Sequence, residues 1–328
     1  MGRSRDLRWR VRQGERPDSE FSLLLPRRPP LGVDRYLPVP ADNPLTAEKV
    51  SLGRTLFFDR RLSGDGTLSC ASCHEPRRAF TDGRSVAQSI GGVRGRRNSP
   101  TLVNRAWGGS FLLDGRARSL EDLALRPILD PTELGATADT VLSLARSTYR
   151  SRFRTAFDAE PALELIARAL ASYLRTIVDG NSAFDRFAAG NDSALTASAR
   201  RGLTLFNGKA GCGQCHSGTN LTDEQFHNTG IAWRPGGLTD EGRAGVTHAA
   251  ADRGAFKTPT LREISRTAPY MHDGSLMSLP QVIDYYDTGG AKNPFLAPEL
   301  RPLHLSPLEK ADLVAFLNSL AGRIQEGK

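Results

Sequence analysis

The feature that most constrains this chain is a pentapeptide that occurs twice, at residues 70–74 and 212–216. Both copies read C-x-x-C-H, and together they contain all four cysteines of the sequence. This pattern is the attachment signal for c-type haem, in which two thiols meet the two vinyl groups of one porphyrin and the adjacent histidine binds the iron. We therefore predict covalent haem at Cys70, Cys73, Cys212 and Cys215, with His74 and His216 as proximal iron ligands.

Three other uses of paired cysteines are weaker explanations. A zinc site needs Cys or His pairs placed to close one tetrahedron, and a thioredoxin-like dithiol needs no following histidine. A structural disulfide would likewise leave both histidines unexplained. Because the pattern occurs twice and no cysteine is left over, haem attachment is the better interpretation.

A second repeat precedes each pentapeptide. The pattern x-Gly-x-Thr-Leu-Phe occurs at residues 52–57 and again at 201–206, which indicates two duplicated cytochrome modules, one in each half. Each half also ends in an amphipathic stretch, at 165–177 and 308–320, whose apolar residues recur at helical spacing. Gly322 is the expected end of the second of these helices.

The whole pattern predicts a mainly α-helical fold with two cytochrome c-like haem domains and long loops, because strand signals are scarce. Thr46 is the expected N-cap of the first helix. Residues 1–40 are rich in proline and arginine and predict an extended, poorly ordered segment. The first haem domain is then expected at 41–192 and the second at 193–328.

Composition narrows the choice of partners. The formal net charge is +8, but only six of the 44 basic residues are lysines, and no basic run is interleaved with aromatic residues. We expect no nucleic-acid partner, although a positive surface can steer an acidic redox protein. No apolar run approaches the ~18 residues that a membrane span requires.

Localisation rests on chemistry rather than on a targeting segment. Covalent haem c is attached outside the cytoplasm, so a periplasmic protein is expected. Residues 1–30 are polar and rich in arginine and lack the apolar core of a secretory signal. A signal would therefore precede the printed sequence, or the start codon is assigned wrongly.

Four further segments accompany the haem motifs: Leu-Phe-Phe-Asp-Arg-Arg-Leu-Ser at 56–63, Arg-Asn-Ser-Pro-Thr at 97–101, Asp-Gly-Arg-Ala at 114–117 and Thr-Ala-Pro-Tyr-Met-His-Asp-Gly at 267–274. With these segments, the chain from about residue 38 to 322 closely resembles the bacterial di-haem cytochrome c peroxidase family, which includes MauG. The resemblance implies a peroxide site at the amino-terminal haem and an electron-transfer site at the carboxy-terminal haem. It also allows a homodimer.

The resemblance implies further roles around the first haem. Glu133 matches the catalytic glutamate of the family, and Pro127 matches a proline that lines the same pocket. A carboxylate near the iron can move a proton from the inner to the outer peroxide oxygen. Typical family members place a blocking histidine where this chain has Gly92, and no histidine lies between His74 and His216. We therefore expect a first haem that is open to peroxide without prior reduction.

At the second haem, Tyr286 occupies the position of the usual distal methionine, as in MauG-like members. A phenolate stabilises ferric iron, whereas methionine raises the haem potential, so a low potential is expected. Met271 and Met277 are the competing ligands, and Tyr285 and Tyr286 could instead be core aromatics.

Other positions depart from the family or are shared with it. Leu113 replaces a tryptophan that lies between the haems, and Trp107 is its nearest substitute in sequence, although a tryptophan there is more often a core residue. Leu123 replaces a pocket glutamine of MauG-like proteins. The resemblance also implies one Ca²⁺ ion between the haem domains, held by Asn98, Thr267 and Pro269. Arg116 is expected either to contact a haem propionate or to form a surface ion pair.

The leading functional hypothesis is a peroxidase that reduces hydrogen peroxide with electrons from a small cytochrome c or a cupredoxin. The main alternative is a MauG-like oxidase that uses peroxide to modify tryptophan or tyrosine on a partner protein. A third hypothesis is a di-haem electron carrier without catalysis, but a carrier gains nothing from an open iron.

Overall fold

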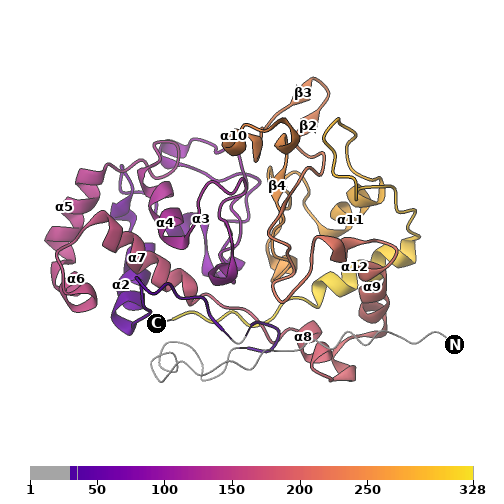
Figure 1. Ribbon diagram of the computed structural model, residues 1–328, viewed down its shortest axis with the longest axis horizontal. Coiled ribbons are helices and arrows are strands. Elements are labelled where there is room, and N and C mark those ends of the chain that lie inside the picture. Colours follow the sequence, from indigo (N-terminus) through magenta and orange to yellow (C-terminus); the bar gives the residue numbers. More distant parts are fainter. Residues whose placement is uncertain (1–29, 35, 328) are drawn as a thin grey trace.

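The computed structural model describes residues 30–34 and 36–327, and the chain forms two mainly helical lobes (Figure 1). Most of the segment expected to be poorly ordered, residues 1–29, lies outside the described residues. Within the described part, Asn181 donates its backbone N–H to the carbonyl of Leu31 over 2.8 Å. The last residues before the first helix are therefore held against the body of the protein.

The expected helical fold is confirmed, and the elements are as follows. The first lobe contains α2 (Ala47–Phe58), α3 (Cys70–Cys73), α4 (Leu120–Leu129), α5 (Ala138–Thr148), α6 (Arg150–Phe157) and α7 (Leu163–Arg175). The connection and the second lobe contain α8 (Ala183–Ala188), α9 (Ala197–Asn207), α10 (Ala244–Thr247), α11 (Leu279–Asp287) and α12 (Pro307–Asn318). The 3₁₀ turns are η1 (Arg60–Leu62), η2 (Pro76–Arg78), η3 (Ile90–Gly92), η4 (Arg105–Trp107), η5 (Asp192–Ala194), η6 (Cys212–Gln214), η7 (Ala250–Asp252) and η8 (Ile264–Arg266).

Sheet is confined to short pairs in the described residues. Strand β1 (Phe226–His227) pairs antiparallel with β4 (Phe256–Lys257), and β2 (Trp233–Arg234) pairs antiparallel with β3 (Gly237–Leu238). Outside these pairs and its helices, the second lobe consists of long irregular segments, in agreement with the scarcity of strand signals.

The two pairs of long helices have the same packing. Helix α2 crosses α7 at Gly53, where a Cβ would lie 1.9 Å from the carbonyl oxygen of Ala169. Helix α9 crosses α12 at Gly202, where a Cβ would lie 2.0 Å from the carbonyl oxygen of Asp312. The glycine of each x-Gly-x-Thr-Leu-Phe repeat is therefore the point at which two helix backbones touch.

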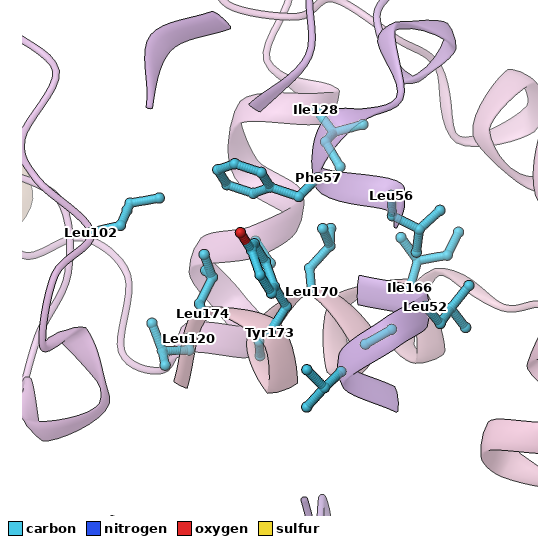
Figure 2. Close-up of a cluster of buried hydrophobic side chains, with 14 of the residues drawn as sticks. Leu52, Leu56, Phe57, Leu102, Leu120, Ile128, Ile166, Leu170, Tyr173 and Leu174 are labelled. Carbon is cyan, nitrogen blue, oxygen red and sulfur yellow. The ribbon is translucent and has the colours of Figure 1, made fainter. Parts of the chain in front are cut away.

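Aromatic pairs follow one turn after each glycine. The rings of Phe57 and Tyr173 lie 5.2 Å apart in the first lobe, and those of Phe206 and Phe316 lie 5.0 Å apart in the second. Figure 2 shows Phe57 and Tyr173 within the buried cluster that α2 and α7 share with Ile128. The repeated pattern thus specifies both the close approach of the helices and the core beside it.

Helix ends follow local chemistry. The Thr46 hydroxyl accepts the Lys49 backbone N–H at the start of α2, which confirms the expected N-cap. The prediction that Gly322 ends the last helix is wrong, because α12 ends at Asn318. Gly322 instead donates its backbone N–H to the Glu263 carboxylate over 2.8 Å.

The end of the described chain returns to the first lobe, beside α2 (Figure 1). Gln325 and Val178 form an antiparallel bridge, and the Gly327 N–H donates to the Thr176 hydroxyl over 2.9 Å. The division of the chain at residue 192 remains a prediction. No helix among the described residues is both long and apolar enough to cross a membrane.

Candidate functional site

The first C-x-x-C-H motif lies on α3, with His74 as the residue that follows this helix. Cys70 and Cys73 form no disulfide, and burial raises the pKa of their thiols to about 12 and about 11. The Nδ1 atom of His74 lies 3.0 Å from the carbonyl oxygen of Phe80. That contact fixes the imidazole and leaves Nε2 free to bind a metal.

The second motif has the same arrangement on η6. Its cysteines form no disulfide either, and burial raises the pKa of Cys212 to about 11. The Nδ1 atom of His216 lies 3.1 Å from the carbonyl oxygen of Leu221. Burial lowers the pKa of both motif histidines, so both rings are neutral, the form that binds metals.

These residues fit covalent haem c better than the alternatives. The raised pKa values of Cys70, Cys73 and Cys212 oppose the thiolate that dithiol redox chemistry requires. Each motif offers two cysteines and one histidine, one ligand short of a closed structural zinc site. Thioether bonds to a porphyrin place no charge on the sulfur atoms, and each oriented imidazole can offer Nε2 to the iron. With haem bound, the four cysteines would anchor two porphyrins.

Glu133 lies at the first motif. Burial, followed by smaller contributions that include the charge of Glu133, raises the pKa of Cys70 and Cys73. Its loop is held by backbone hydrogen bonds: the Leu134 N–H donates to the Pro127 carbonyl over 3.0 Å, and the Ile90 N–H donates to the Glu133 carbonyl over 3.1 Å. The structure thus brings the predicted catalytic glutamate and the predicted pocket proline together beside the first haem motif.

The electrostatics of Glu133 are balanced by opposite effects. Burial and then the neighbouring charge of Asp130 raise its pKa, while Arg116 lowers it. Arg116 lies 3.8 Å from the Glu133 carboxylate and 2.7 Å from that of Asp114. The propionate contact expected of Arg116 remains a prediction, whereas its approach to Glu133 is a contact that the sequence did not predict.

Gly92 lies in η3, on the loop that packs against Glu133. Its φ is +74°, and a Cβ there would meet only the side-chain amide nitrogen of Gln88, at 3.5 Å. The expectation that this position leaves the first haem open remains a prediction. Neighbouring Val93 is 62% exposed.

Tyr286 lies on α11 and faces the second motif. Burial raises its pKa, and the neighbouring Cys212, Tyr285 and Cys215 add to the shift. The Tyr285 hydroxyl is engaged elsewhere, because it donates to the Thr229 carbonyl over 2.7 Å. Of the competing methionines, Met277 is 58% exposed, which is unlike a residue held against a buried haem. Met271 has a left-handed backbone, with a φ of +75°, and this does not test whether it binds the iron.

Ion pairs join the lobes between the two motifs. Arg97 bridges Asp114 of the first lobe, at 2.6 Å, and Asp240 of the second, at 2.8 Å. Leu113 accepts the backbone N–H of Lys257 over 2.9 Å. Arg97 belongs to a segment that the sequence analysis singled out. Its partners Asp114 and Asp240 lie 17 and 143 residues away along the chain, and no local pattern predicts these ion pairs.

Of the residues predicted to bind calcium, Asn98 is connected by a hydrogen bond to the segment that contains the other two. The Asn98 N–H donates to the His272 carbonyl over 2.7 Å, and its side-chain amide donates to the Arg84 carbonyl over 2.7 Å. Asn98 is therefore tied to the segment that contains Thr267 and Pro269. The calcium site remains a prediction.

One cluster was missed by sequence reasoning. Ligand atoms of Cys215, Asp223 and His227 lie within 4.8 Å of one another, and His227 Nε2 lies 2.8 Å from the Asp223 carboxylate. Contact with Cys215 and then with Asp223 raises the pKa of His227 to about 9. A thioether bond at Cys215 would use its thiol, so only Asp223 and His227 of this cluster would remain for a metal ion.

Comparisons with known proteins decide the family. The family model described as "Di-haem cytochrome c peroxidase" matches residues 47–193. The methylamine utilization protein MauG of Methylorubrum extorquens is 45% identical over 288 residues, which cover 87% of this chain and 81% of that protein. The chain belongs to the di-haem cytochrome c peroxidase/MauG family.

Other relatives match most of the chain. Cytochrome-c peroxidase IdrP1 of Denitromonas iodatirespirans is 37% identical over 330 residues and covers 89% of this chain and 86% of its own. A solved MauG-like protein associated with microbial copper homeostasis has a TM-score of 0.81 and 34% identity, over 91% of this chain and 95% of its own. Both haem motifs lie within the span that these relatives cover.

Proposed function

We propose that this protein reduces hydrogen peroxide to water at its first haem and takes the electrons from a small cytochrome c or cupredoxin through its second haem. The observation that carries the proposal is the position of Glu133, close enough to Cys70 and Cys73 to raise the pKa of both thiols. A carboxyl group in that place can serve a ligand bound at the iron. Peroxidases among the relatives support the same assignment.

The chain supplies orientation and proton transfer. When bound, the haems supply the redox chemistry, with the first iron as the site of peroxide reduction. The His74 ring is held by the Phe80 carbonyl, so His74 would bind the first iron, and Gly92 supplies no side chain that could compete with peroxide for it. The Glu133 carboxylate would accept the proton of the inner peroxide oxygen and return it to the outer one, so that water leaves.

A MauG-like oxidation of a partner protein is the second candidate. The place of Tyr286 beside Cys212 and Cys215 and the 45% identity to a MauG favour it. Leu113 speaks against it, because an aliphatic side chain cannot be oxidised to share charge between the haems.

One experiment separates the two candidates from a plain electron carrier. Hydrogen peroxide is added to the purified di-haem protein, both haems are followed by absorbance, and a reduced small cytochrome is then supplied. Rapid oxidation of the cytochrome supports the peroxidase. A long-lived oxidised state that the cytochrome does not discharge supports the protein oxidase, and the absence of any reaction would leave only the carrier.

The remaining assignments belong to the same proposal. Tyr286 is the distal ligand of the second haem, Arg116 contacts a propionate, and a Ca²⁺ ion is held by Asn98, Thr267 and Pro269. Because haem c is attached outside the cytoplasm, the protein acts in the periplasm.

A further inference from the structure

A line of buried aromatic rings leads away from the first haem motif. The carbonyl oxygen of Phe80 contacts the imidazole of His74, and the Phe80 ring lies 6.3 Å from that of Phe57. The Phe57 ring in turn lies 5.2 Å from that of Tyr173 (Figure 2). All three aromatic residues are at most 2% exposed.

The line ends at a phenol with a proton acceptor. The Tyr173 hydroxyl donates a 2.6 Å hydrogen bond to the carboxylate of Glu326. The other oxygen of that carboxylate lies 3.5 Å from the Arg54 guanidinium, which is 41% exposed. The phenol is therefore buried, while its acceptor reaches the surface.

The second lobe shows that the hydroxyl is not needed for packing. Phe316 occupies the position that corresponds to Tyr173, with the same interplanar angle of 61° to its partner Phe206. Leu221 takes the place of Phe80 as the carbonyl partner of the motif histidine. The phenol, its carboxylate and the third aromatic ring are thus particular to the lobe assigned to peroxide.

We propose that Tyr173 is a redox-active residue, which gives one electron toward the first haem while its phenolic proton passes to Glu326. The proposal rests on the proposed function, since hydrogen peroxide is the oxidant that draws the electron. The O–H bond of Tyr173 breaks, an O–H bond forms on the Glu326 carboxylate, and a neutral tyrosyl radical remains. A phenol that loses an electron becomes a strong acid, so the short bond to a carboxylate is what makes the oxidation feasible in a buried site.

This route gives oxidising equivalents an exit from the first haem. Leu113 cannot be oxidised to carry such an equivalent between the haems. Phe80 and Phe57 are not oxidised either, but their closely spaced rings fill the space through which an electron passes from Tyr173. When the electron donor is scarce, the equivalent is held on Tyr173, until an electron from the donor restores the phenol and Glu326 returns the proton.

The test uses the di-haem protein without a donor. One equivalent of hydrogen peroxide is added, samples are frozen rapidly, and electron paramagnetic resonance and haem absorbance are recorded. An organic-radical signal whose hyperfine pattern changes when the protein contains ring-deuterated tyrosine is expected. Tyr173→Phe is expected to lose this signal, and Glu326→Gln to delay its appearance.

Tyr149→Phe is the matched control, because Tyr149 also donates a 2.6 Å bond to a carboxylate, that of Asp59, in the same lobe. The control should keep the signal, and Tyr173→Phe should keep normal turnover when a reduced cytochrome is present. A signal unchanged in Tyr173→Phe, or no signal although the haem absorbance responds to peroxide, overturns the inference alone. Haem absorbance that does not respond at all overturns the proposed function and this inference with it.

Discussion

At the scale of single residues, the two haem motifs differ in the side chains around them. Glu133, Arg116 and the open position at Gly92 surround the first motif, and Tyr286 faces the second. The carboxyl of Glu133 has a raised pKa because burial and Asp130 outweigh Arg116. Each of these neighbours can be changed separately.

Glu133→Gln is expected to lower kcat with peroxide by roughly 10²–10⁴-fold, because a carboxamide cannot carry the proton. The measurement is peroxide-dependent oxidation of a reduced small cytochrome. Glu75→Gln is a matched control, since among the described residues the half-exposed Glu75 carboxylate forms its ion pair with Arg78, which is itself exposed. Full turnover in Glu133→Gln would remove the glutamate from the mechanism.

The pH profile of the same reaction tests the charge balance. As a base, Glu133 acts when ionised, so activity should rise with pH through a pKa above its ordinary value of 4.5. Arg116→Gln removes the group that lowers this pKa and should move the rising limb to higher pH. A limb that stays in place, or moves to lower pH, would contradict the assignment.

Tyr286→Met should raise the reduction potential of the second haem, since methionine ligation favours ferrous iron relative to a phenolate. A potentiometric titration followed by absorbance gives the potential of each haem. Tyr285→Phe is the control, because the Tyr285 hydroxyl binds the Thr229 carbonyl. Equal shifts in both variants would show that Tyr286 is not the ligand.

At the scale of elements, the repeated helix pair organises each lobe. The sequence repeat and the helical periodicity were enough to predict the amphipathic helix that ends each half and the mainly helical class, but not which helices pair. They did not predict that Gly53 and Gly202 are crossing points, because the partner carbonyls lie more than 100 residues away along the chain. Gly322 shows the same limit, since its bond to Glu263 is a tertiary contact.

Gly53→Ala should destabilise the first lobe by about 2–3 kcal/mol, because the new methyl group must push α2 away from α7. Denaturant unfolding followed by helical circular dichroism measures the change. Gly109→Ala is the control, since a Cβ at Gly109 meets nothing within 4 Å. Equal stability of the two variants would show that the helices do not cross this closely.

At the scale of the whole molecule, the lobes meet around buried charge. Asp179 is fully buried, and neither of its carboxyl oxygens has a hydrogen-bond partner among the described residues when it is ionised. Burial and then the adjacent Glu263 raise its pKa, while Arg262 opposes the shift and Asp185 adds to it. A protonated Asp179 can donate to Glu263, which links the first lobe to the second.

This raised pKa makes stability depend on pH. The folded protein holds a proton on Asp179 that the unfolded chain releases above its ordinary pKa of 3.8. Stability should therefore fall as pH rises from 3.8 toward the raised pKa of about 8, by at most about 1.4 kcal/mol per pH unit. Asp179→Asn should remove that slope. Denaturant unfolding at a series of pH values measures it, and a slope that survives in the variant would assign it to other groups.

The sequence predicts part of the candidate site, and the structure adds the rest. The haem cysteines, their histidines and Glu133 could be predicted because motif spacing and family resemblance place them. The Arg97–Asp240 ion pair could not be predicted, because its residues are 143 positions apart. The contact of Arg116 with Glu133 and the cluster at His227 join residues closer along the chain, but irregular segments place them and no periodic pattern describes such segments. The contacts that the sequence did not predict therefore lie mostly in long loops rather than in helices.

The central claim is that the first haem reacts with peroxide without prior reduction. Its most direct test is to mix the fully oxidised di-haem protein with hydrogen peroxide in a stopped-flow spectrometer, before any electron donor is present. An immediate change in haem absorbance, followed by rapid oxidation of an added reduced cytochrome, is the predicted result. A protein that stays inert until one haem has been reduced would contradict the claim and show that the first iron is closed in the oxidised state.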